Sequence, residues 1–113
     1  MRGAPRLNHL VTLEAPISTP DGAGGRIAGW VVRGSLRAAI EERSETRRGA
    51  DGVAVVRTRS VFTIRAAPPG APSRPEPGQR LRMAGRVWRI RAVRPHRAWA
   101  ALLECIAEEE YPA

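Results

Sequence analysis

With 113 residues, the chain is long enough for one domain with a single modest core, and residues 1–113 are predicted to form that domain. Its 19 basic residues are all arginine and outnumber 11 acidic residues, so its formal charge of +8 favours an anionic partner, or serves solubility alone. A single cysteine excludes an intrachain disulfide, and no apolar run is long enough for a membrane span or a signal peptide.

Proline and glycine, with 10 and 11 copies, divide the chain into short segments without a helical apolar period, so short strands are expected. The first strand is predicted over residues 9–15, where Val11, Leu13 and Ala15 share one side. A turn-rich loop is expected over residues 16–25, because aspartate, proline and glycine are concentrated there.

Alternation returns over residues 26–40. The apolar residues at even positions are predicted to share one face, and they are Trp30, Val32, Leu36, Ala38 and Ile40. Gly34 interrupts this pattern and indicates a bulge or a bend. Residues 41–52 are polar and charged except for Ala50, so an exposed loop is expected there.

The second half of the chain is predicted to hold four more strands. Residues 53–65 are rich in β-branched residues on both parities, which is typical of a central or bent strand. Prolines exclude a helix or a central strand over residues 66–77, so an extended surface connection is expected. Two hairpins follow, with strands over residues 80–83, 86–93 and 98–107 and turns at residues 84–85 and 94–97.

Together these segments predict a mainly β fold, a small antiparallel β-barrel or sandwich of five to seven short strands with long loops. Catalytic sequence motifs are absent. His9 and His96 lack the spacing of a metal site, and Cys105 falls in a predicted buried strand. The chain is therefore predicted not to be an enzyme, with no catalytic, cofactor-binding or metal residues.

Arginine clustering is the strongest functional signal. Arg43, Arg47 and Arg48 crowd the predicted loop, and further arginines run through the terminal hairpins. Such side chains attract DNA phosphates without reading bases, or else point into solvent and pair with acids. The acidic end of the mostly basic chain either contacts another copy head to tail or is a solvated tail, and it consists of Glu108, Glu109 and Glu110.

Five segments in a fixed order carry a family pattern across almost the whole chain. They are RLNHLVTLEAP near the N-terminus, DGAGGRIAGW at residues 21–30, LRAAIEERSE at 36–45, VFTIRA at 61–66 and GRVWRIRAV at 85–93. This ordered set resembles the phage head-tail joining proteins, also called head-closure, stopper or head-tail adaptor proteins. With the all-arginine composition, it also fits a gene transfer agent.

The resemblance implies a β-barrel subunit of a ring at the neck of a virion or phage-like particle, assembled in the reducing cytoplasm. A hexameric ring is favoured over a dodecameric one. Expected partners are the portal or adaptor ring above, the tail terminator or tail tube below, and packaged double-stranded DNA in the channel, with no membrane. The DNA-facing loop would contain Arg43, Arg47 and Arg48, and the subunit interface would contain Asp21, Gly24, Gly25, Glu108, Glu109 and Glu110.

A different class of protein, a monomeric OB-like barrel that binds nucleic acid, is the alternative. Such a protein needs aromatic side chains on an exposed sheet face for base stacking. This chain has few aromatic residues, and Trp30 and Trp88 are predicted to lie in the core. Binding of single-stranded DNA by the purified monomer distinguishes the two.

Overall fold

The computed structural model describes residues 3–111, which form six strands and no helix. The described chain thus has no helix that could cross a membrane. The strands are β1 (His9–Pro20), β2 (Arg26–Arg48), β3 (Ala54–Arg65), β4 (Arg80–Met83), β5 (Arg86–Pro95) and β6 (Leu102–Glu110).

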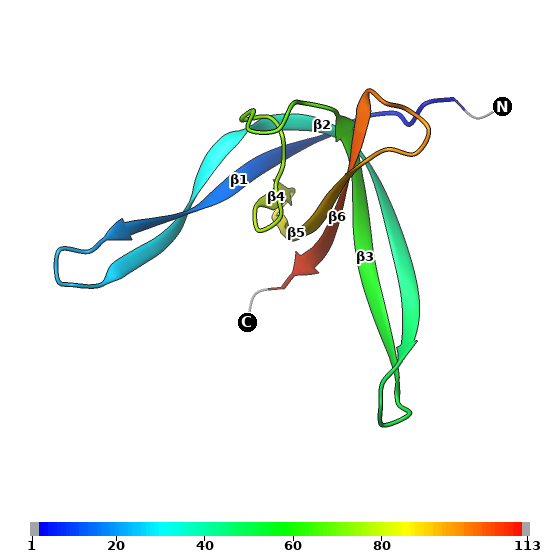
Figure 1. Cartoon of the computed structure of the whole chain (residues 1–113), viewed down its shortest axis with the longest axis horizontal. Coiled ribbons are helices and arrows are strands. Elements are labelled where there is room, and N and C mark those ends of the chain that lie inside the picture. Colours follow the sequence, from blue (N-terminus) through cyan, green and yellow to red (C-terminus); the bar gives the residue numbers. More distant parts are fainter. Residues whose placement is uncertain (1–2, 112–113) are drawn as a thin grey trace.

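All six strands pair antiparallel in one sheet that closes on itself in the order β1-β2-β3-β6-β5-β4 (Figure 1). The short strand β4 completes the ring by pairing with β1 on one side and β5 on the other. This confirms the predicted mainly β, antiparallel fold. Closure pairs the backbone N–H and C=O groups at the strand edges within the barrel, which would otherwise be free to pair with other chains.

The core lies inside this barrel. Its centre is an edge-to-face pair of aromatic rings, Phe62 and Trp88, whose centroids are 5.2 Å apart. Cys105 is fully buried, as predicted, and burial raises the pKa of its thiol to about 12. Aliphatic residues from every strand complete the core, and they are Val11, Leu13, Ala38, Ile64, Leu81, Ile90, Leu103 and Ala107.

Two β-hairpin arms leave the barrel in different directions (Figure 1). The 23-residue strand β2 runs from one arm through the barrel into the other. The first arm comprises residues 15–32, where β1 pairs with β2, and the second comprises residues 41–59, where β2 pairs with β3. The molecule therefore extends over 59 × 42 × 26 Å.

The loops expected over residues 16–25 and 41–52 are wrong in extent. β1 continues to Pro20 and β2 to Arg48, which leaves only residues 21–25 and 49–53 as turns. Each residue from Glu41 to Arg48 has a partner on β3, so the backbone polar groups are satisfied by pairing even though the side chains are polar. Nonlocal pairing thus overrides the weak apolar pattern of these segments.

Gly34 marks a β-bulge, as predicted. Leu13 of β1 lies opposite Gly34 and Glu14 lies opposite Val32, so Arg33 is the extra residue. The φ angle of Gly34 is 153°, a region that favours glycine. The bulge reverses the parity of β2, so the expectation that Trp30 and Val32 share a face with Leu36, Ala38 and Ile40 is wrong.

The C-terminal hairpins are present with shifted boundaries. The turn at Ala84 and Gly85 is confirmed, with positive φ angles of 51° and 78°. The last strand was expected over residues 98–107 but is β6, Leu102–Glu110, because residues 98–101 belong to the preceding turn. Residues 66–77 contain neither helix nor strand, as the prolines predicted. The expected extended surface connection is wrong, because backbone hydrogen bonds from Ala71 to Pro68 and from Arg74 to Ala71 close turns within it and Pro75 is fully buried.

Candidate functional site

The strand register of the second arm separates its arginines onto two faces. Arg43 lies opposite Arg59, and Glu45 lies opposite Arg57. Directly opposed residues of an antiparallel pair point to the same face. One face of the arm, here called the arginine face, therefore carries Arg43, Arg47, Arg57 and Arg59 together with Glu41 and Glu45.

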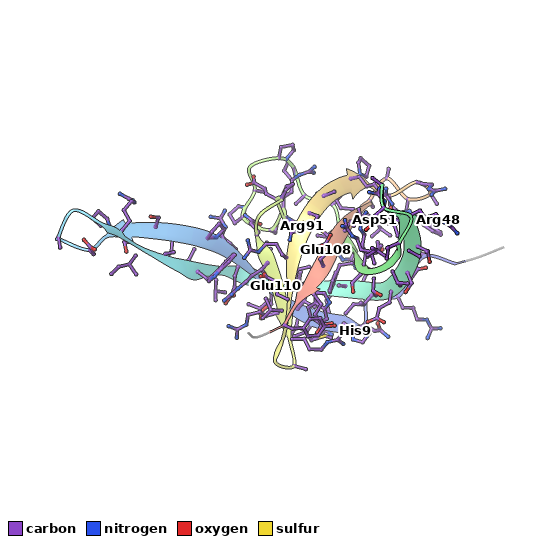
Figure 2. The ribbon with its side chains drawn as sticks, turned by 90° about the horizontal axis from the view of Figure 1, so that it is seen from below. His9, Arg48, Asp51, Arg91, Glu108 and Glu110 are labelled. Atoms are coloured by element: carbon purple, nitrogen blue, oxygen red, sulfur yellow. The ribbon has the colours of Figure 1, made fainter. Side chains whose placement is uncertain are left out.

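Arg48 is absent from the arginine face. It pairs with Ala54 and so shares the other face of the arm with residues such as Thr46 and Val56. Figure 2 shows Arg48 with Asp51 near the turn of this arm. Of the three arginines predicted to contact DNA, the structure thus brings together Arg43 and Arg47 and sets Arg48 apart.

Ion pairs neutralise part of the arginine face. Arg43 lies 3.2 Å from Glu41, and Arg59 lies 3.6 Å from Glu45 and 4.0 Å from Glu108. Within residues 3–111, no carboxylate forms an ion pair with Arg47 or Arg57. The uncompensated positive charge of this face therefore belongs to Arg47 and Arg57.

The three C-terminal glutamates lie in β6 and pair with arginines of β5 in the same chain. Glu109 and Arg86 are 2.6 Å apart, Glu110 and Arg89 3.0 Å, and Glu108 and Arg91 3.6 Å. Figure 2 places Arg91, Glu108 and Glu110 on these neighbouring strands. The hydrogen bond from Arg86 lowers the pKa of Glu109. Their role in a subunit interface remains a prediction, but their charges already have partners.

Asp21, Gly24 and Gly25 form the turn at the tip of the first arm. The Oδ1 atom of Asp21 accepts the backbone N–H of Ala23 at 2.8 Å and that of Gly25 at 3.0 Å. Gly24 has a φ angle of 87°, which a side chain would disfavour. These residues shape the turn, and their contact with another subunit stays a prediction.

A cluster that sequence reasoning missed fixes the base of the first arm to the barrel. Glu14 is 5% exposed and accepts hydrogen bonds from Arg80 and, at 3.3 Å, from Arg82. The guanidinium groups of Arg80 and Arg89 lie over the ring of Trp30, at 4.2 Å and 4.8 Å. Trp30 is only partly buried in this cluster, so its predicted place in the core is wrong.

No group of three or more His, Cys, Asp or Glu residues in the described chain could hold a metal ion. His96 stabilises its own turn, because its Nδ1 atom accepts the backbone N–H of Ala98 at 3.0 Å. The features that distinguish this molecule are therefore its two arms and their faces.

Comparisons with known proteins relate this chain to a family and to a solved structure. A family model described as "Phage head completion protein" matches residues 2–110. The chain belongs to this family. It is also similar to a chain of a solved structure entitled "Virion of native gene transfer agent (GTA) particle", with 37% identity and a TM-score of 0.73 over 95% of this chain and 98% of that chain. No curated protein matches.

Membership of the head completion family confirms the resemblance to phage head-tail joining proteins. The protein is a structural head-closure component of a phage-like particle, and it associates there with other proteins of the capsid and tail. A structural role in the particle agrees with the prediction that the chain is not an enzyme.

Proposed function

We propose that this protein forms a ring at the neck of a phage-like particle of the gene transfer agent type, assembled in the cytoplasm. The ring, hexameric rather than dodecameric, joins the portal or adaptor ring to the tail terminator or tail tube. It surrounds the packaged double-stranded DNA and holds it until the tail docks. The observation that carries this proposal is the pair of long arms on a small closed barrel, in a chain of the head completion family.

The arms suit assembly better than solitary existence. A two-stranded ribbon is marginally stable alone in water, and its unpaired backbone edges attract further strands. The barrel has no such edges, because each of its strands is paired on both sides. Contacts between identical copies are therefore expected through the arms.

The arginine face supports the DNA contact. The second arm is a β-ribbon that reaches away from the barrel (Figure 1). Arg47 and Arg57 lie on this arm, where phosphates of a duplex in the channel can approach them. Contacts of this kind depend on charge and on salt but not on base sequence, as a channel protein requires. Each subunit contributes only a few arginines without an ion-pair partner, but a ring of subunits places many such arginines around the DNA.

The double variant Arg47→Gln, Arg57→Gln is expected to make purified particles lose packaged DNA several-fold faster than the wild type. The two substitutions remove phosphate contacts without breaking any ion pair of the described chain. Nuclease-sensitive DNA released over time from particles at physiological salt measures this loss.

The matched control replaces Arg33 and Arg37 with glutamine. Both are exposed residues of β2, and neither lies on the arginine face. Their replacement removes the same amount of positive charge as the replacement of Arg47 and Arg57. This control is expected to retain DNA as the wild type does. Equal retention by both double variants would refute the assignment of the arginine face to DNA.

The OB-like alternative gains no support from the part of the chain that the structure describes. Trp88 is buried in the core, and the ring of Trp30 is occupied by two arginine side chains. A sheet face with free stacking aromatics, which that function requires, is not formed by residues 3–111.

A further inference from the structure

The first arm carries an uncovered apolar face that continues the interior of the barrel. On β1 the core residues Val11 and Leu13 are followed on the same side by Ala15 and Ile17. On β2 the bulge at Gly34 shifts the parity, so Val31, opposite Ala15, lies on this face, and so does Ile27, opposite Thr19. We call Ala15, Ile17, Thr19, Ile27, Gly29 and Val31 the apolar face.

The large side chains of this face, Ile17, Ile27 and Val31, are of the kind that forms protein cores, but they lie outside the core of this barrel. Ile17 is 43% exposed, Ile27 58% and Val31 41%, and no charged residue lies among them. Burial of such surface stabilises by about 25 cal/mol for each Å² removed from water. A two-stranded arm has no second layer of its own to provide that burial.

An apolar hollow of about 350 Å³ lies at the other end of the molecule. Figure 1 shows the tip of the first arm at one end of the longest axis and the segment between β5 and β6, with the N-terminal segment, towards the other. The hollow has one charged lining residue, Arg65, and its other lining residues are Ala4, Pro5, Leu7, Trp99, Ala101 and Leu102.

We propose that the apolar face of the first arm of one copy docks in the apolar hollow of the next copy. This inference rests on the proposed ring and names the contact that builds it. Two different, complementary surfaces on one molecule form a head-to-tail contact, which closes into a ring when the rotation between copies allows.

A second copy fits these surfaces better than a foreign partner. Permanent interfaces between copies are more apolar than transient ones, and the apolar face offers no charge that would select another protein. The charge-based head-to-tail contact predicted for Glu108, Glu109 and Glu110 is weakened as an alternative, because arginines of the same chain already pair with these residues.

Disulfide trapping in purified particles tests the contact. The double variant Ile27→Cys with Ala101→Cys places one thiol on the apolar face and one, at an exposed position, in the hollow. Mild oxidation is expected to convert most of this chain into a ladder of covalent multimers. The native Cys105 is not expected to form disulfides in this assay, because it is buried and its thiol pKa is about 12.

The control is Val32→Cys with Ala101→Cys. Val32 is 60% exposed on the same arm but points to the opposite face, so this variant is expected to stay monomeric after oxidation. Val31→Cys with Ala101→Cys provides a second reporter on the apolar face and is expected to give the ladder.

The outcomes separate this contact from the ring itself. A ladder from both apolar-face variants, without one from the control, supports the contact. Particles that contain a ring of this chain but give no ladder would overturn the contact and leave the ring intact. A disulfide-linked product with another particle protein, formed by both apolar-face variants but not by the control, would overturn the contact and assign the apolar face to that protein. Particles without a ring of this chain would overturn the proposed function.

Discussion

Replacement of Trp88 with alanine is expected to lower the free energy of unfolding by about 3–5 kcal/mol. The Trp88 side chain is 1% exposed and packs edge to face against Phe62 at the centre of the core. No neighbouring strand can fill the space, because the closed sheet fixes the distance between its walls. Natural domains have total stabilities of about 5–15 kcal/mol, so this single change removes much of the fold's margin.

Urea denaturation followed by circular dichroism measures this effect. Val56→Ala is the matched control, since Val56 is 68% exposed on the second arm, and a change there is expected to stay within about 0.5 kcal/mol. A Trp88→Ala protein as stable as this control would contradict the placement of Trp88 in the barrel core.

Replacement of Glu14 with alanine is expected to cost about 3 kcal/mol, the second largest effect. The Glu14 side chain is 6% exposed and binds both Arg80 and Arg82. Without it, Arg80, whose side chain is 21% exposed, keeps its charge beside Trp30 with no carboxylate partner. The penalty arises from that uncompensated charge more than from the lost attraction.

Thermal or urea unfolding of Glu14→Ala and of the Glu14→Ala, Arg80→Ala double variant separates these contributions. The double variant is expected to recover part of the loss, because the unpaired charge is removed with its partner. Glu41→Ala is the control, since its pair with Arg43 is exposed on both sides and contributes at most about 1 kcal/mol. Equal losses from Glu14→Ala and Glu41→Ala would show that the Glu14 cluster does not fix the first arm.

Much of the fold could be predicted from local signals. Alternation located β1 and β5, β-branched residues on both parities located β3, and the turn at Ala84 and Gly85 was predicted between two short apolar segments. The second arm could not be predicted, because residues 41–48 lack an apolar side and are strand only through pairing with β3. Such pairing is nonlocal, and composition carries little information about it.

The candidate site was predictable only in part for the same reason. Arg47 and Arg48 are neighbours in sequence but lie on opposite faces once the segment is a strand, and Arg57 joins Arg47 only through the register set by the turn at residues 49–53. The clustering of arginines was visible in the sequence. The face that they share required the pairing.

Imaging of intact particles by electron cryomicroscopy, with this chain located along the particle axis, tests the central claim most directly. The expected result is a closed ring of copies at the neck, with first arms seated on neighbouring subunits and arginine faces turned towards DNA in the channel. A chain that occupies another part of the particle, or that is present there as a single copy without a ring, would contradict it.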